Sequence, residues 1–269
     1  MARILTAVIA LPVLIASIWW AALAPIFVAL AAAAMMLGLY EFYLLAGKLQ
    51  IKADVSVGTL FAAAVLIICY FNELAWLPIV VAAFVIVSLA AAMLRRGASF
   101  DRMIAATGAT LLGVLYVALL GGHLIALRTG FAQDSSAKLL SLFFLILMGS
   151  DTAAYYTGRA FGRHKLAPSI SPGKTWEGAV GGMAASLLAV IVARSWFFPE
   201  LRLEVGLPLA AAMNVLGVIG DLTESALKRG AGAKDAAHIL PGHGGLLDRL
   251  DSLLFNAPVI YYFGLLYLG

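Results

Sequence analysis

Long apolar runs recur from one end of this chain to the other and limit its fold more than any other feature. Each run approaches the ~20 residues that an α-helix needs to cross the hydrocarbon core of a bilayer. Over the whole sequence 63% of residues are hydrophobic and 12% are charged, whereas about a quarter of the residues of a soluble domain are charged. The sequence therefore predicts an all-α, polytopic integral membrane protein and argues against a soluble globular domain.

The apolar runs predict about nine transmembrane helices in a single membrane domain, residues 1–269. Residues 1–130 supply the N-terminal helices, and residues 131–269 supply the helices and loops that carry most of the polar motifs. The first run lacks a convincing cleavage site, so we interpret it as a membrane helix rather than a signal peptide. The expected spans are 4–20, 25–46, 54–72, 74–94, 103–127, 138–160, 175–198, 205–228 and 251–268.

The distribution of positive charge predicts the orientation in the membrane. If nine spans alternate in direction, 14 of the 18 lysines and arginines fall on one side. Cytoplasmic loops carry an excess of these residues, so we expect the N-terminus inside the cell, the C-terminus outside, and a bacterial cytoplasmic membrane. The loops between the sixth and seventh spans and between the last two spans then face the cytoplasm. The four exceptions are Arg128, Lys138, Arg194 and Arg202.

Acidic residues inside the apolar runs are candidates for function. An ionised carboxylate within a span costs on the order of a few kcal/mol, so it usually faces a polar cavity or a partner. Asp151, Tyr155 and Gly158 have a helical spacing that places them on one face of the sixth span. A buried aspartate that only bonds a neighbouring helix is the alternative. Glu41 stands alone near the end of the second span, and the sequence assigns it no role.

The eighth span carries a second polar face near its end. Asp221, Glu224 or Ser225, and Lys228 lie along this face at helical spacing. Lys228 is therefore expected near Asp221, where it would orient the carboxylate or contact a phosphate. A ladder of ion pairs within the helix is the alternative explanation.

The last span begins with two carboxylates, Asp248 and Asp251, on one face of its first turn. Carboxylates suit the positive end of a helix, so capping is an alternative role. Capping needs only one of them, however, and does not account for the glycine pair 244–245 just before them. Such glycines let a backbone approach a ligand closely. We therefore interpret "PGHGG" as a turn whose main-chain N–H groups face a phosphate.

The loop between the sixth and seventh spans offers positive charge. The stretch "SPGKTWEG" is expected to start a helix, with Thr175 as a possible N-cap and Lys174 beside the positive end of the helix dipole, which is a ready anion site. "GKT" also suggests a nucleotide-binding P-loop, but that motif needs a glycine where this chain has Pro168, and no strand is expected before it. The P-loop interpretation therefore fails.

Together, these residues indicate phosphoryl or nucleotidyl transfer. Hard cations such as Mg²⁺ take oxygen ligands from a few carboxylates and complete their shell with substrate phosphates, while lysine and arginine neutralise the rest of a polyphosphate. The sequence contains no Cys/His set for zinc and no Gly-x-Ser-x-Gly or Ser/His/Asp pattern for acyl chemistry. A site at the membrane mouth would admit a lipid phosphate from the bilayer and a nucleotide from the cytosol.

The segment from Ser225 to Asp251 resembles the signature of phosphatidate cytidylyltransferases, also called CDP-diacylglycerol synthases. A second block, "DTAAYYTGRAFGRHKLAPSISPGKTWEG", resembles the upstream conserved region of the same family, so the resemblance covers the C-terminal half. The N-terminal half matches only as a series of helices. The residues that carry the signature are Ser225, Leu227, Lys228, Arg229, Lys234, Asp235, Pro241, His243, Gly244, Gly245, Asp248, Arg249 and Asp251.

The resemblance implies a reaction in which CTP and phosphatidic acid give CDP-diacylglycerol and pyrophosphate, with Mg²⁺ required. A second cation, divalent or monovalent such as K⁺, is left open. Asp221 and Asp248 are the first choices as metal ligands, and Asp251 and Asp151 the second. Asp221, Lys228, Asp248 and Asp251 form the expected catalytic set. The expected substrate-binding residues are Ser171, Lys174, Ser225, Arg229, Lys234, Asp235, His243, Gly244, Gly245 and Arg249.

Three other functions remain as alternatives. A CTP-dependent kinase of a polyprenol or phytol would deliver the γ-phosphate, and a CDP-archaeol synthase would use an ether lipid. An ion-coupled transporter is disfavoured, because carriers place their polar groups near the bilayer midplane, often in two related halves. The expected partners are CTP, phosphatidic acid and the bilayer, with no nucleic acid. The small-residue face "GGMAAS" favours a homodimer.

Overall fold

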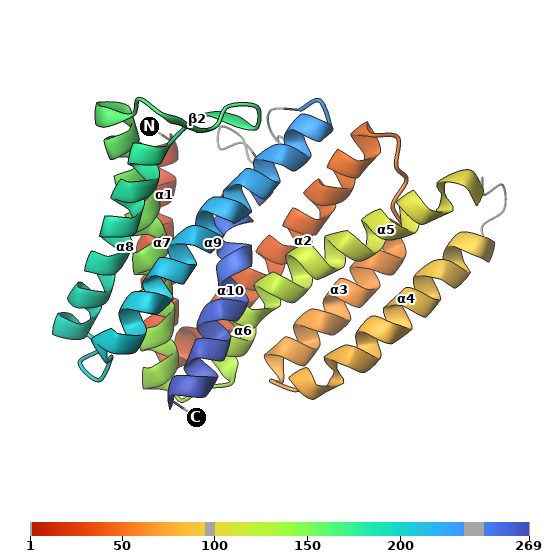
Figure 1. Ribbon diagram of the computed structural model, residues 1–269. Coiled ribbons are helices and arrows are strands. Elements are labelled where there is room, and N and C mark those ends of the chain that lie inside the picture. Colours follow the sequence, from red (N-terminus) through yellow and green to blue (C-terminus); the bar gives the residue numbers. More distant parts are fainter. Residues whose placement is uncertain (1, 95–99, 234–244, 269) are drawn as a thin grey trace.

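Long helices make up most of the chain and run between the same two ends of the molecule (Figure 1). The computed structural model describes residues 2–94, 100–233 and 245–268. Among these residues, six helices are long and apolar enough to cross a membrane. Large apolar side chains such as Ile86, Ile104 and Leu266 are mostly exposed, as expected where a surface meets lipid. The chain is therefore an all-α polytopic membrane protein.

The N-terminal half is a series of helices joined by short connections. A π-helical turn, η4, joins α5 to α6 without a loop, so the three form one continuous rod. The elements are α1 (Ala2–Trp19), η1 (Ala21–Leu23), α2 (Ala24–Lys48), α3 (Val55–Tyr70), η2 (Leu74–Trp76), α4 (Leu77–Leu94), η3 (Phe100–Arg102), α5 (Met103–Gly113), η4 (Val114–Leu119) and α6 (Leu120–Thr129).

The C-terminal half consists of four long helices and one small hairpin. The hairpin lies at the same end of the molecule as the start of α1, whereas α10 ends at the opposite end (Figure 1). The elements are α7 (Gln133–Phe161), β1 (Lys165–Ala167), β2 (Ser171–Thr175), α8 (Trp176–Trp196), α9 (Leu203–Gly230) and α10 (Leu247–Leu268).

Each predicted span overlaps a helix, or the continuous rod of α5 to α6, within the described residues. The largest differences lie at two helix starts. Helix α7 begins at Gln133 rather than near 138, and α10 begins at Leu247 rather than near 251. Both extra turns contain charged residues, Asp134 and Asp248, which an apolar-run criterion leaves out. The number of membrane crossings stays a prediction.

The hairpin corrects the expected loop between the sixth and seventh spans. β1 and β2 pair antiparallel, with Lys165 opposite Thr175 and Ala167 opposite Ser171. A strand therefore does precede "GKT", contrary to the expectation from sequence. The P-loop remains excluded, because Pro168 still occupies the position of the required glycine. The predicted cap is confirmed, since Thr175 Oγ1 accepts a hydrogen bond from the Gly178 N–H at 3.1 Å and α8 begins there.

Helices α7, α8 and α9 pack closely and hold the hairpin over one end of the bundle (Figure 1). Asn214 of α9 donates a hydrogen bond of 2.6 Å to Ser150 of α7, and both side chains are buried. The small residues Gly182 and Ser186 of α8 are also buried inside this group. Part of the small-residue face "GGMAAS" therefore packs against helices of the same chain. This face no longer supports a homodimer, and dimerisation stays a prediction.

Candidate functional site

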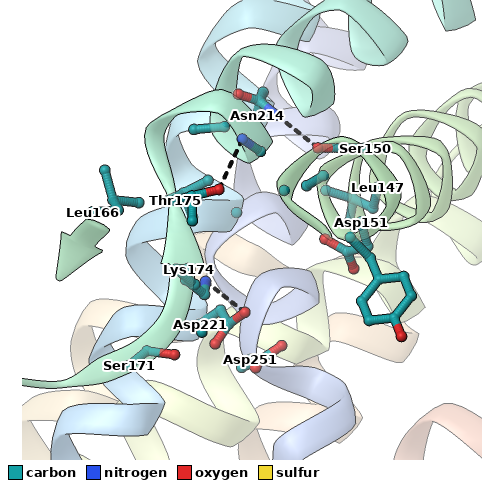
Figure 2. Close-up of a pocket in the computed structure, with 18 of the residues that line it drawn as sticks. Leu147, Ser150, Asp151, Leu166, Ser171, Lys174, Thr175, Asn214, Asp221 and Asp251 are labelled. Atoms are coloured by element: carbon teal, nitrogen blue, oxygen red, sulfur yellow. Dashed lines mark hydrogen bonds and ion pairs between the residues drawn. The ribbon is translucent and has the colours of Figure 1, made fainter. Parts of the chain in front are cut away.

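A cavity of about 560 Å³ lies between α7, the hairpin, α8, α9 and α10. Figure 2 shows Asp151, Lys174, Asp221 and Asp251 around it, contributed by four different elements. The cavity gathers four carboxylates and two of the predicted cations. The predicted site residues that line it are Ser171, Lys174, Asp151, Asp221, Asp248, Arg249 and Asp251.

Helix α7 contributes the face that the sequence predicted. Asp151, Tyr155 and Gly158 all line the cavity. Asp151 lies ten residues before the end of the helix at Phe161, which corresponds to about 15 Å at 1.5 Å per residue. The residue therefore lies about three turns before the end of the helix, and its side chain is exposed at the cavity. Because it faces a polar cavity, a role limited to helix packing does not account for it.

The hairpin brings a cation to α9. Lys174 Nζ lies 2.6 Å from Asp221 Oδ2 (Figure 2). Lys174 is placed by its neighbours in sequence, since β2 ends at Thr175 and α8 begins at once. Lys174, the only lysine among the residues that line the described cavity, is therefore held between strand β2 and the cap of α8. Ser225, one turn along α9, donates a longer hydrogen bond of 3.4 Å to Asp221 Oδ1.

A second lysine pairs within α9 and also joins α9 to α10. Lys228 Nζ lies 2.6 Å from both Glu224 Oε2 and Asp248 Oδ1. The pair with Glu224 lies within α9, as the alternative of ion pairs within the helix held, whereas the pair with Asp248 was not predicted. The ion pair of Asp221 is with Lys174. Helical spacing on α9 alone could not reveal the carboxylate that α10 supplies. Lys228 does not line the cavity, and instead it fixes Asp248, which does.

The first turn of α10 carries the remaining acids. Asp248 Oδ2 accepts a hydrogen bond from the Gly245 N–H at 3.0 Å, two residues before α10 begins, while its Oδ1 pairs with Lys228. Asp251 Oδ1 accepts from the Ser252 N–H at 2.6 Å. Both acids line the cavity together with Arg249. The contact between Asp248 and Gly245 does not satisfy an N–H group of α10 itself, because Gly245 precedes the helix, so the alternative role as a cap stays a prediction.

Other predicted residues lie outside the cavity wall. Arg229 Nε donates to the Ile170 carbonyl at 3.4 Å, which links the end of α9 to the hairpin turn. Ser225 touches the site only through Asp221. Gly245 lies before α10 and holds Asp248 through its N–H. Lys234, Asp235, His243 and Gly244 lie outside the described residues.

Sequence reasoning missed three buried polar groups around the site. Ser150 and Asn214 line the cavity and bond each other, and polar residues inside apolar runs were the available signal. Glu41 of α2 is fully buried and accepts hydrogen bonds from the backbone N–H groups of Leu246 and Leu247. Its partners lie far away in the sequence, so the residues around Glu41 gave no signal for this contact.

Comparison with known proteins places this chain in a family. A family model described as the cytidylyltransferase family matches residues 1–267. The chain belongs to the cytidylyltransferase family. The match covers both halves of the chain, so it includes the N-terminal helices, for which the sequence motifs carried no information.

Curated relatives share a part of the sequence with this cytidylyltransferase-family chain. It is 41% identical over 129 residues to a phosphatidate cytidylyltransferase of Haemophilus influenzae, which covers 46% of this chain and 45% of the relative. It is 45% identical over 131 residues to one of Brucella suis, 46% of each chain. With one of Staphylococcus haemolyticus it shares 47% identity over 119 residues, 44% of this chain and 45% of the relative. The chain thus aligns with about half the length of these relatives.

The donor set of this family member suits Mg²⁺. In the described residues, no group of three or more His, Cys, Asp or Glu side chains converges to form a ready metal centre. Mg²⁺ does not require one, because it commonly binds one or two carboxylates and completes its shell with water and substrate phosphates. Asp221, Asp248, Asp251 and Asp151 provide such oxygens around one cavity. The metal-binding roles stay predictions.

Proposed function

We propose that this protein transfers the cytidylyl group of CTP to phosphatidic acid, which gives CDP-diacylglycerol and pyrophosphate in phospholipid biosynthesis. The observation that carries the proposal is the cavity, which gathers four aspartates, Lys174 and Arg249 inside a bundle with an apolar exterior. Membership of the cytidylyltransferase family supports the group transferred. The names of the curated relatives support phosphatidic acid as the acceptor.

The chemistry follows from the charges of the substrates. A phosphate oxygen of phosphatidic acid forms a bond to the α-phosphorus of CTP. The bond from that phosphorus to the oxygen bridging to the β-phosphate breaks, and pyrophosphate leaves with the electron pair. The attacking phosphate is already anionic near neutral pH, so no side chain has to remove a proton. The protein contributes mainly by orienting two anions and by neutralising their charge.

The residues of the cavity divide this work. Lys174 of β2 and Arg249 of α10 both line the cavity. They supply positive charge for the triphosphate and the lipid phosphate. Asp221 and Asp248, with Asp251 and Asp151 as further candidates, would hold Mg²⁺. When bound, Mg²⁺ neutralises charge on the phosphates. A second cation, divalent or monovalent such as K⁺, is part of the proposal but has no assigned ligands.

The depth of the cavity suits two substrates of different solubility. Asp221 lies nine residues before the end of α9 at Gly230, about 13 Å below it at the helical rise. A phosphate headgroup would reach this level from the bilayer, and CTP would enter from the end that carries the hairpin. We assign that end to the cytoplasm of a bacterial cell, with the N-terminus inside and the C-terminus outside, because positive charge gathers there.

The proposal is tested by finding out which lipid accepts the group transferred from CTP. We would incubate the purified protein with CTP and Mg²⁺ and offer phosphatidic acid, an ether-linked analogue such as archaetidic acid, or a polyprenol, then identify the lipid product by mass spectrometry. We expect CDP-diacylglycerol from phosphatidic acid and no product from the polyprenol. A phosphorylated polyprenol would instead establish a CTP-dependent kinase, and a CDP-linked product from the ether lipid alone would establish a CDP-archaeol synthase. Folded protein that forms no lipid product at all would contradict an enzyme of this class.

A further inference from the structure

A buried carboxylate from the N-terminal half reaches the catalytic half of the chain. Glu41 of α2 has no exposed surface. Its Oε1 accepts a hydrogen bond of 2.9 Å from the Leu246 N–H, and its Oε2 accepts one of 2.7 Å from the Leu247 N–H. Both oxygens of one side chain are therefore used on consecutive backbone donors, at the start of α10.

Helix α10 needs these acceptors. The first N–H groups of any helix have no partner within the helix, and a side chain at the N-cap usually supplies an oxygen. Here α10 begins at Leu247, and the residue before it is Leu246, whose side chain has no acceptor. Asp248 satisfies only the Gly245 N–H. Glu41 supplies the missing cap from another helix, and its carboxylate also meets the positive end of the α10 dipole.

An apolar contact one turn away fixes the same junction. Gly38 lies three residues before Glu41, and a Cβ atom at Gly38 would lie 3.1 Å from Leu250 Cδ1. Leu247 and Leu250 are both buried. Glycine at this position lets α10 approach α2 closely enough for Glu41 to reach the backbone. The polar and apolar contacts therefore specify one position of α10 along α2.

We propose that Glu41 is a positioning residue for the active site, acting through the first turn of α10. That turn carries Asp248, which pairs with Lys228 at 2.6 Å, and Asp251, and both line the cavity. A rotation or shift of the turn would move both acids relative to Asp221 on α9. The N-terminal half thus contributes to the site without a side chain in it. The effect on catalysis rests on the proposed cytidylyl transfer, whereas the effect on α10 does not.

The test compares Glu41→Gln with wild type. Glutamine has nearly the same size but presents one oxygen and one NH₂ group, so it cannot accept from both N–H groups. Hydrogen–deuterium exchange of the peptide covering residues 245–250 is expected to accelerate, while exchange in α7 stays unchanged. The half-saturating Mg²⁺ concentration for activity is expected to rise about tenfold, the effect typical of residues that orient metal ligands. A purely structural role would lower the melting temperature without changing that concentration.

Two further variants complete the design. Glu73→Gln removes an exposed carboxylate just before η2 and is expected to match wild type in every measurement. Glu41→Asp keeps both carboxylate oxygens but holds them one methylene further from the N–H groups of α10. We expect its exchange rate at 245–250 and its half-saturating Mg²⁺ concentration to lie between those of wild type and Glu41→Gln. If Glu41→Gln does not fold, Glu41→Asp carries the test alone, with the same expected direction.

The outcomes separate this proposal from the proposed function. The positioning role would be overturned if both Glu41 variants matched Glu73→Gln in hydrogen exchange at 245–250 and in the half-saturating Mg²⁺ concentration. If wild type shows no cytidylyl transfer but Glu41→Gln still accelerates exchange at the start of α10, the structural link stands and the proposed function fails. If wild type transfers the cytidylyl group and the first turn is unchanged in the variants, the proposed function stands and the positioning role fails.

Discussion

At the scale of single residues, Asp221, Asp248 and Asp251 each have a cationic or backbone partner. Asp221 pairs with Lys174 and Asp248 with Lys228, both at 2.6 Å. Asp251 accepts from the backbone of its own helix. The paired aspartates are held in place by a short contact to one oxygen, and the other oxygen of each accepts a further hydrogen bond, from the Ser225 hydroxyl in Asp221 and from the Gly245 N–H in Asp248. Such pre-oriented groups lower the reorganisation that binding requires.

Asp221→Asn tests the centre of this arrangement. The change keeps the shape of the side chain but removes its charge and weakens the contact to Lys174. We expect cytidylyl transfer to fall by roughly 100-fold or more, the size seen when one pre-oriented electrostatic group is lost, with little change in melting temperature. The assay is initial rate with CTP and phosphatidic acid.

Asp134→Asn is the matched control for this variant. Asp134 forms a 2.7 Å ion pair with Lys138, but its own side chain is largely exposed, where an ion pair contributes little. The control is expected to keep wild-type activity. Equal activity in both variants would remove Asp221 from the active site.

The sequence predicted some residues and not others for a physical reason. Asp151, Asp221 and Asp251 were predicted to share a polar site, because a charge inside an apolar run needs a cavity or partner, and they line one cavity. The contact of Lys228 with Asp248 was not predicted, since spacing along α9 reports only on α9. The role of Glu41 could not be predicted either, because its partners are backbone N–H groups at the start of α10. Every residue type except proline has such a group, so the sequence does not mark them.

At the scale of elements, the hairpin and the close approach of α7 to α8 shape the cavity. The hairpin was not predicted, because β1 has three residues and β2 contains "SPGKT", which has the composition of a loop. The start of α8 was predicted correctly, because Thr175 is a local capping signal. Local signals were therefore sufficient for a helix boundary but not for a pairing between two short strands.

Gly178 tests the contact between α7 and α8. A Cβ atom here would lie 2.8 Å from the Ala154 carbonyl oxygen and 3.4 Å from Gly158 Cα, and these are backbone atoms that cannot rotate away. We expect Gly178→Ala to destabilise the protein by about 1–3 kcal/mol, the usual cost of overpacking, and to reduce activity because it separates Asp151 from the hairpin. Thermal unfolding in detergent and the initial rate measure the two effects.

Gly149 provides the control within α7. A Cβ atom there meets nothing within 4 Å, so Gly149→Ala is expected to leave activity unchanged and to raise stability by up to about 1 kcal/mol through helix propensity. A similar loss of stability in both variants would show that helix α7 is generally intolerant of alanine, and not that this contact is tight.

At the scale of the whole molecule, the apolar runs predicted the class of fold and most helix boundaries. They could not predict which helices touch, because the spans are apolar over much of their surface and a bilayer does not drive them together by hydrophobic burial. Three of the four exceptions to the charge asymmetry have partners in the structure, but the orientation itself stays a prediction. Arg128 is buried and donates to the Ser17 carbonyl, Lys138 pairs with Glu200, and Arg202 pairs with Glu204.

The proposed orientation predicts which loops face the cytoplasm. The single cysteine, Cys69, is buried, so wild type is expected to be inert to a membrane-impermeant maleimide. Ser169→Cys in the hairpin turn and Pro199→Cys between α8 and α9 both create exposed thiols. In intact cells without an outer-membrane barrier, we expect Pro199→Cys to react and Ser169→Cys to react only after permeabilisation. The reverse pattern would invert the protein in the membrane and move the site outside the cell.

The most direct measurement of the central claim follows two labels of one substrate. CTP labelled at the α-phosphate or at the γ-phosphate would be incubated with the purified protein, Mg²⁺ and phosphatidic acid, and the lipid extracted. Cytidylyl transfer predicts that the α-label enters the lipid and the γ-label leaves as pyrophosphate. Entry of the γ-label into the lipid, or of neither label with folded protein, would contradict the account.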